Sequence, residues 1–486
     1  MRRIVNLTLA VALIAIPAAA SARPSGDGVN VVVADAAEAK GEFELVGHEP
    51  LMNRGMNAAL AVHKGYAYVG SRTDGLHPNA SVMIVDVSDP GAPTVVGQIG
   101  TPDAANPGET TREMRIWPEE DILIILNLAS NCSYLIHACS PTSATGTDVY
   151  RFFDISGDKA SAPELIGEYA PSSNPHEFFL WDDPKDKDRT LLYQSNTGSG
   201  TQMTITDISD ARKGKFDEIV VWETVVPSPD TDNRLHSMTV TPDGRRTHIA
   251  ILGGGYLELD TSQVAAGKSK PKIKQITNME KRPAWGDPGA HSTVKFPGRD
   301  FVFAADEVYG EVPVLLAGHG CPWGWVRIID IRNHVFPKIV SEFKLPQNEE
   351  EFCESLTDND PLRNSTSSYA AHNPTLTDNL ALITWHAGGM VAVDISNPKK
   401  PALAAQFVPE PLVAVTQEDP ALSSGHDKVA MWSFPVVKDG LIYAVDVRNG
   451  LYILRYSGPY EKEVASLKFL EGNSNLGAAA KLDRSY

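Results

Sequence analysis

The stretch SVMIVDVSDPGAPTVVGQI (residues 81–99) contains an apolar strand, a proline-containing turn and a second short strand. The same phrase returns as VYRFFDISGDKASAPELIGEY (149–169) and MVAVDISNPKKPALAAQFV (390–408), and weaker copies lie at 203–223, 255–263, 325–343 and 450–458. Strand pairs joined by a tight turn precede the copies, as in ALAVHKGYAYVG (59–70). Four strands per unit at seven places predict an all-β fold, a seven-bladed β-propeller of four-stranded antiparallel blades.

The N-terminus is expected to close the predicted ring. The last unit supplies three strands, and FELVGHE (43–49) resembles the fourth-strand phrases TVVGQI and ELIGEY. We therefore expect residues 43–49 to complete the last blade, and the propeller to span residues 41–458. The segments 23–40 and 459–486 are rich in Ala, Gly, Ser and charge, which indicates a flexible N-terminal segment and a poorly ordered C-terminal tail.

Composition and the N-terminus restrict the class of protein. The net charge of −18 over 486 residues leaves no basic surplus to neutralise nucleic-acid phosphates. A charged start, an apolar run from Ile4 to Ile16 and the small-residue end Ala20-Ser21-Ala22 have the pattern of a signal peptide at 1–22. The alternative, an anchor helix, needs a longer apolar run, and no run further along reaches the ~20 residues of a membrane span. We expect a periplasmic or secreted protein without a membrane span.

Four cysteines in an exported chain suggest two disulfides. We expect Cys132 to pair with Cys139 and Cys321 with Cys353, because each pair lies within one insertion region. The alternative is free, buried thiols.

The I-V-D-[VI]-S-[DN]-P phrase in these repeats resembles the LVIVD-repeat β-propeller proteins. More loosely, the chain is similar to the seven-bladed selenium-binding protein and methanethiol oxidase group. The first resemblance covers nearly the whole chain beyond the signal peptide and implies the propeller fold. It implies little about function, because this fold carries many activities.

Histidines recur where the innermost strand of each blade begins. The equivalent starting positions are Asn57, Arg112, His176, His236, His291, His372 and Trp432. Four successive blades therefore place an imidazole beside one mouth of the central channel. Imidazole is the commonest metal ligand and accepts several transition metals, so the pattern predicts a metal site held by these four histidines.

The histidine ring resembles that of the carotenoid-cleaving oxygenases, seven-bladed propellers in which four histidines bind iron. A copper site is described in the methanethiol oxidase group. These resemblances favour iron or copper as the cofactor, with manganese and zinc also open. The alternative is a structural network like that of WD-repeat propellers, in which a histidine braces its own blade.

Acidic residues and a further histidine are the candidates for catalysis near this ring. Glu177 follows His176, and strand alternation would turn it to the opposite face, either toward a neighbouring blade's ligand or into solvent. His386 is a candidate fifth ligand or proton carrier, or a loop histidine bonded to the backbone. Asp306 and Glu307 are candidate acceptors that fix the orientation of ligating histidines.

Two further starting positions are candidates for substrate binding. Arg112 could meet an anionic substrate or simply pair with Glu113, and Trp432 could form a pocket wall or belong to the core.

Long insertions at 128–147, 307–324 and 346–370 fall on the histidine face of the predicted ring. Together these features predict an exported metalloprotein, an oxidoreductase acting on a small-molecule substrate at the channel mouth. The alternative is a non-catalytic propeller that binds protein or glycan partners through the same loops.

Overall fold

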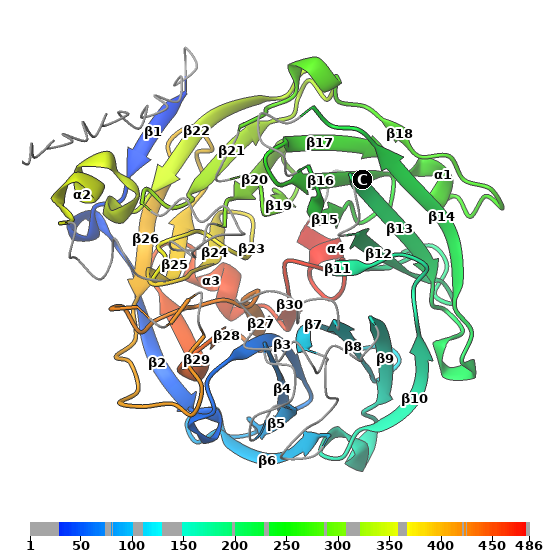
Figure 1. The fold of residues 1–486 in the computed structure, drawn as a ribbon, viewed down its shortest axis with the longest axis horizontal. Coiled ribbons are helices and arrows are strands. Elements are labelled where there is room, and N and C mark those ends of the chain that lie inside the picture. Colours follow the sequence, from blue (N-terminus) through cyan, green and yellow to red (C-terminus); the bar gives the residue numbers. More distant parts are fainter. Residues whose placement is uncertain are drawn as a thin grey trace, which may run out of the picture.

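The computed structural model describes residues 29–72, 79, 81–100, 110–128, 148–196, 200–227, 233–285, 289–307, 321–357, 367–419, 422–423 and 425–482. Within them, seven β-sheets stand around a central channel (Figure 1). Each sheet is one blade, so the predicted seven-bladed propeller is confirmed.

The blades follow one another in chain order. Blade one contains β3 (Asn57–His63), β4 (Tyr66–Ser71), β5 (Val82–Asp86) and β6 (Thr94–Ile99). Blade two contains β7 (Thr110–Trp117), β8 (Ile122–Leu128), β9 (Val149–Asp154) and β10 (Glu164–Tyr169). Blade three contains β11 (Pro175–Asp182), β12 (Thr190–Asn196), β13 (Thr201–Asp207) and β14 (Asp217–Thr224). Blade four contains β15 (Leu235–Val240), β16 (Arg246–Ile251), β17 (Gly255–Asp260) and β18 (Lys274–Gln275), with the short helix α1 (Ser262–Ala265) before β18.

The remaining blades repeat the pattern. Blade five contains β19 (Ser292–Lys295), β20 (Phe301–Ala305), β21 (Val326–Asp330) and β22 (Lys338–Lys344). Blade six contains β23 (Pro374–Leu376), β24 (Leu380–Trp385), β25 (Gly389–Asp394) and β26 (Ala402–Phe407). Blade seven contains β27 (Val436–Lys438), β28 (Leu441–Asp446) and β29 (Gly450–Ser457).

Strands in the middle of a blade are buried on both faces. All six residues of β24 are buried. Successive side chains point to opposite faces, so Ile383 packs with Phe303 of blade five, whereas Leu382 packs with Ile442 of blade seven. The apolar cores therefore lie between neighbouring blades, which explains why the inner strands are so uniformly apolar.

The predicted ring closure is also confirmed. β2 (Glu42–Glu49) pairs antiparallel with β29 as the outer strand of blade seven, and Phe43 lies opposite Tyr456. Because these strands come from opposite ends of the chain, their hydrogen bonds join the first and last parts of the ring.

The expectation of poorly ordered tails is not met in residues 29–40 and 459–482. β1 (Asn30–Val33) adds parallel to β22 at the edge of blade five. After blade seven come α3 (Glu461–Ala465), β30 (Phe469–Leu470) and α4 (Ala479–Leu482), and β30 pairs with β27. Composition missed these segments because their partners lie far away in sequence.

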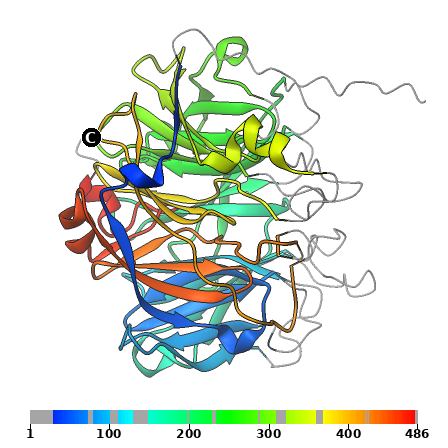
Figure 2. The ribbon, with the colours of Figure 1, turned by 90° about the vertical axis from the view of Figure 1, so that its left-hand side faces the viewer.

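The C-terminal segment fills one end of the channel. Figure 1 shows α4 near the centre of the ring, and Figure 2 shows the C-terminal helices on the side opposite α2 (Glu350–Ser355). The amide of Leu180 donates to the Asn473 carbonyl at 3.3 Å, and the amide of Asp182 donates to Asn475 Oδ1 at 2.7 Å. These residues end β11, whereas His176 lies at its start, so the histidines face the other end of the channel.

Cys321 and Cys353 form a disulfide, as predicted. Cys132, Cys139 and the predicted signal peptide lie outside the described residues. None of the helices in the described part has the length and apolar character needed to cross a bilayer.

Candidate metal centre

The candidate ligands lie at one edge of blades three to six. His176 and His236 are the second residues of β11 and β15, and His291 directly precedes β19. His372 precedes β23 by two residues, whereas Glu307 and His386 follow β20 and β24. Because the first two strands of a blade are antiparallel, the start of one and the end of the next share an edge.

The four predicted imidazoles form a continuous row. The ring centroids of His176 and His236 are 4.4 Å apart, those of His236 and His291 3.8 Å, and those of His291 and His372 4.3 Å. His386 extends the row, with its ring 5.2 Å from that of His372. The convergence expected from the strand register is therefore present, and His386 belongs to the same cluster.

β-Bulges occur at the starts of two of these strands, β15 and β11. In blade four, Leu235 and Ser237 pair with the adjacent residues Ile251 and Ala250, which leaves His236 as the extra residue. A similar register shift separates Pro175 from Phe178 in blade three. A bulge interrupts strand alternation and can re-aim a side chain, a frequent device beside functional sites.

Because of the shift in blade three, Glu177 is not turned into solvent. Its side chain is buried, and Oε1 lies 3.5 Å from Nδ1 of His236 and 3.9 Å from Nε2 of His291. Glu177 therefore contacts histidines of the next two blades, which is the first of the two roles weighed from the sequence.

The outer nitrogens of two imidazoles are held by acceptors, which fixes their tautomers. His372 Nδ1 lies 2.5 Å from the Trp432 carbonyl, and a carbonyl can only accept a hydrogen. His291 Nδ1 lies 2.7 Å from Ser292 Oγ, whose own hydrogen is donated to Asn373 Oδ1. Both Nδ1 atoms therefore donate, and the Nε2 lone pairs face the interior of the cluster.

Glu307 lies on the inner side of the imidazoles. Its carboxylate oxygens are 3.3 Å from Nε2 of His291, 3.2 Å from Nε2 of His372 and 3.2 Å from Nε2 of His386. We expected an acceptor behind the ligands, but Glu307 instead faces the nitrogens that would bind an ion.

Its neighbour Asp306 has a different, structural role. Asp306 accepts hydrogen bonds from the Trp285 indole and from Arg327, away from the imidazole row. The sequence gives no means of separating these two adjacent acids.

Burial shifts the pKa values in the cluster. It lowers the pKa of His176, His236 and His372 well below 6.5. Burial also raises the pKa of Glu177, and the charge of Glu113 adds to that rise. For Glu307, burial opposes ionisation, but the neighbouring His372 and His291 outweigh it and hold the pKa well below its usual range.

One contact in the cluster is suited to a metal ion. His372 Nε2 and Glu307 Oε1 lie 3.2 Å apart, yet neither has a hydrogen-bond partner among the described residues. With the His372 hydrogen on Nδ1, this contact brings a lone pair against a carboxylate oxygen. A metal ion between them would turn the repulsion into shared coordination, so the residues fit a metal.

In the part of the chain that the structure describes, donor atoms form two triplets whose members lie within 4.8 Å of one another. One contains Glu177, His236 and His291, and the other contains His291, Glu307 and His372. Each triplet offers two imidazoles and one carboxylate.

The predicted substrate-binding residues flank the cluster. The Trp432 ring lies 4.7 Å from that of His372, and the Arg112 guanidinium lies over Trp432 at 5.5 Å. Trp432 is buried and also packs in a small apolar core. It therefore lies beside the cluster, as a pocket wall would, and belongs to the core as well. Glu113 pairs with Arg115 at 3.0 Å.

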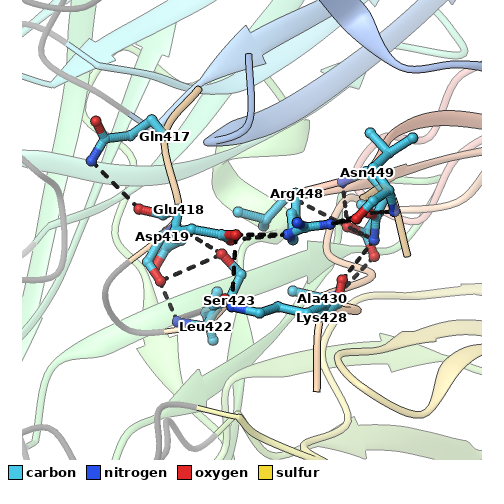
Figure 3. Close-up of polar contacts among 12 residues, drawn as sticks. Gln417, Glu418, Asp419, Leu422, Ser423, Lys428, Ala430, Arg448 and Asn449 are labelled. Atoms are coloured by element: carbon cyan, nitrogen blue, oxygen red, sulfur yellow. Dashed lines mark hydrogen bonds and ion pairs between the residues drawn. The ribbon is translucent and has the colours of Figure 1, made fainter. Parts of the chain in front are cut away.

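The segment between β26 and β27 also contributes residues beside the candidate site, which the sequence did not reveal. Its Asp419 binds Arg72 through a 2.6 Å ion pair, and Arg72 lies over the Trp432 ring at 5.1 Å. Figure 3 shows Asp419 held by contacts with Ser423 and Leu422, beside Arg448 and Glu418, which form a second ion pair. The only sequence clue is the length of this connection.

The described ends of the blade-five insertions cover His386. Ser368 Oγ lies 3.1 Å from His386 Nδ1, and the ring of Tyr369 packs 5.3 Å from that of Trp323. The expected insertion at 346–370 therefore contributes directly to the candidate site.

The LVIVD repeat family model matches residues 54–101 and 375–408, which lie in blades one and six. The chain contains LVIVD repeats. These matches agree with the repeats that predicted the propeller. No curated protein sequence matches the chain.

Solved structures of Sqt1 from Chaetomium thermophilum are similar in fold. Sqt1 bound to the N-terminus of the ribosomal protein L10 is 13% identical with a TM-score of 0.45, covering 84% of this chain and 89% of that chain. A second Sqt1 structure is 13% identical with a TM-score of 0.46, covering 84% and 86%. A third is 13% identical with a TM-score of 0.46, covering 88% and 89%.

Proposed function

We propose that this LVIVD-repeat propeller binds a transition metal at the histidine row and is an exported oxidoreductase. The contact between His372 Nε2 and Glu307 Oε1 carries the proposal, because a metal ion between these two atoms, 3.2 Å apart, would bind both the imidazole lone pair and the carboxylate oxygen. A second buried carboxyl group, that of Glu177, lies 3.5 Å from His236 and 3.9 Å from His291.

Iron(II) is the first candidate metal. Two imidazoles and one carboxylate are the ligands of many non-haem iron oxygenases, and both donor triplets have this composition. Copper is the second candidate, and manganese and zinc accept the same donors. A bound iron would supply one-electron and oxygen chemistry, while the chain's own residues hold it and leave room for a substrate.

The surroundings support a small-molecule substrate at this mouth of the channel. Trp432 and Arg112 offer an aromatic surface and a positive charge beside His372. His386, whose Nε2 faces Glu307, is placed to carry a proton near that surface. The Cys321–Cys353 disulfide supports an oxidising compartment and hence export.

The test is metal analysis of protein purified without a histidine tag. We expect at least one equivalent of transition metal per chain by inductively coupled plasma mass spectrometry, with iron the most abundant. Replacing both His291 and His372 by Ala should reduce the bound metal at least tenfold. The control is His248→Ala, because His248 is equally buried but bonds Tyr256 within blade four.

Metal-free wild-type protein that also fails to take up added iron, copper, manganese or zinc would contradict the proposal. Equal metal in the double variant and the wild type would contradict the assignment of these ligands. Either result would favour a binding protein that acts through its loops.

A further inference from the structure

We infer that blades one, two and seven form an anion-binding subsite beside the proposed metal, and that it selects a substrate with a carboxylate group. The inference rests on the proposed function and names the class of substrate for that site. The histidine row ends at blade six, and the equivalent edge of blades one and two carries arginines instead.

A β-bulge brings Arg112 of blade two to the same mouth of the channel as the histidines. The pairing of β7 with β8 skips Arg112, just as the pairing of β15 with β16 skips His236. The extra residue of a bulge is turned out of the regular strand alternation. Burial and, in second place, the charge of Arg112 lower the pKa of His176, so the guanidinium lies near the imidazole row.

Arg72 of blade one reaches the same place from the end of a second strand. It directly follows β4, as His386 directly follows β24. Its side chain is fully buried, and its Nε donates to Asp419 at 2.6 Å. The guanidinium groups of Arg72 and Arg112 lie 5.1 and 5.5 Å from the centre of the Trp432 ring. Two guanidinium groups therefore meet at one tryptophan.

The indole N–H of Trp432 is a buried donor that lacks an acceptor. Trp432 is 3% exposed, and its Nε1 has no hydrogen-bond partner among the described residues. The carbonyl of Trp432 is fixed by His372 and Asn373, at 2.5 and 3.2 Å. Since leaving a buried donor unpaired costs free energy, an acceptor atom of a ligand would stabilise this position.

A carboxylate suits this set of donors better than a neutral group or a phosphate. One oxygen would accept from the Trp432 indole and the other from the Arg112 guanidinium, and such charge-assisted hydrogen bonds are strong. Asp419 already balances the charge of Arg72, which favours a ligand with one negative charge over one with two. An acid held here would lie beside His372, one of the proposed metal ligands.

The experiment is isothermal titration calorimetry of the full-length protein, both metal-free and loaded with Zn(II). The probes are propionate, its neutral analogue propionamide, and inorganic phosphate. We expect both forms of the wild type to bind propionate about tenfold more tightly than the other two probes. Arg112→Gln and Trp432→Phe should each weaken propionate binding by about tenfold, the effect of losing one hydrogen bond to a charged group, with unchanged zinc content. Trp432→Phe removes the N–H but keeps an aromatic ring.

A second arginine–tryptophan pair supplies the matched controls. Arg189 lies over Trp181 at 5.6 Å, at the end of β11 away from His176, and the buried Trp181 indole donates to the Pro242 carbonyl at 3.1 Å. Arg189→Gln and Trp181→Phe should bind propionate as the wild type does.

Equal binding of propionate and propionamide by the wild type overturns the inference, while the metal content still decides the proposed function. Tighter binding of phosphate than of propionate overturns the choice of a carboxylate. Unchanged propionate affinity in both Arg112→Gln and Trp432→Phe overturns the assignment of these residues.

Propionate binding that depends on Arg112 and Trp432, in a protein that takes up no metal, supports the subsite and overturns the proposed function. If one of the two variants fails to fold by circular dichroism, the other variant and the comparison of the three probes decide.

Discussion

The hydrogen on each imidazole determines what the histidine row can bind. His291 is held in one tautomer by Ser292, which is in turn committed to Asn373. His372 is held by a backbone carbonyl, which no side-chain substitution removes. The orientation of His291 therefore depends on a hydroxyl that can be tested directly.

Replacing Ser292 by Ala removes the acceptor for His291 Nδ1. We expect metal affinity to fall about 10- to 100-fold, the usual effect of losing a partner that orients a ligand. The number of ions bound at saturating metal should stay the same. Isothermal titration calorimetry measures both quantities.

Ser341→Ala is the matched control, because Ser341 is a buried serine of the same blade that bonds the Pro398 carbonyl. Equal loss of affinity in both variants would show that the effect comes from blade five as a whole.

A histidine outside the cluster gives the protein a predictable pH response. His334 Nδ1 lies 2.9 Å from the buried Glu258, and this hydrogen bond raises the pKa of His334 above 6.5. Folding therefore favours protonated His334. Its contribution to stability is fully present below pH 6.5 and is lost as the pH rises through the raised value.

We expect His334→Gln to lower the unfolding temperature more at pH 5.5 than at pH 8.5. The difference should be small, because the His334 side chain is 43% exposed. Differential scanning calorimetry of both proteins at both pH values measures it. An equal decrease at the two pH values would rule out the linkage.

At the scale of single elements, β2 closes the ring by pairing with β29. Its Gly47 sits where a register shift separates it from Leu45, close to the turn of blade one. A Cβ built on Gly47 would lie 2.0 Å from the Pro90 carbonyl oxygen, so the strand can approach blade one only without a side chain there.

Gly47→Ala should destabilise the protein by about 1–3 kcal/mol, the usual cost of overpacking. The nearby Gly91→Ala is the control, because its added Cβ would meet nothing closer than 3.4 Å. Chemical denaturation of the two variants compares their free energies of unfolding. If Gly91→Ala is as destabilised as Gly47→Ala, the close approach of β2 is not the cause.

At the scale of the whole molecule, the C-terminal segment links blades that are distant in the ring. Asn473 accepts from Arg115 of blade two and Leu180 of blade three, and Asn475 bonds both the amide and the carbonyl of Asp182. β30 meanwhile pairs with blade seven. The segment therefore acts as a tie across the end of the channel opposite the histidines.

A chain ending at residue 458 should unfold at a lower temperature than the full chain. Losing these hydrogen bonds should by itself lower the free energy of unfolding by a few kcal/mol, at about 1 kcal/mol each. A chain ending at residue 482 is the control, since it keeps the tie. Matching unfolding temperatures for all three chains would mean that the blades hold the ring without it.

Local sequence was sufficient to predict the blades, the closing strand and the row of histidines. Strand alternation and tight turns are short-range features, and equivalent positions in successive blades meet at the channel whatever the details. The copies at 81–99, 149–169 and 390–408 therefore contained enough information to predict the architecture and to align His176, His236, His291 and His372.

Only the tertiary structure decided how the site is built. It separated Glu307 from Asp306, turned Glu177 inward through a bulge, and brought Asp419 to Arg72. It also placed the C-terminal segment in the channel. These outcomes depend on contacts between residues far apart in the chain, which neither periodicity nor composition records.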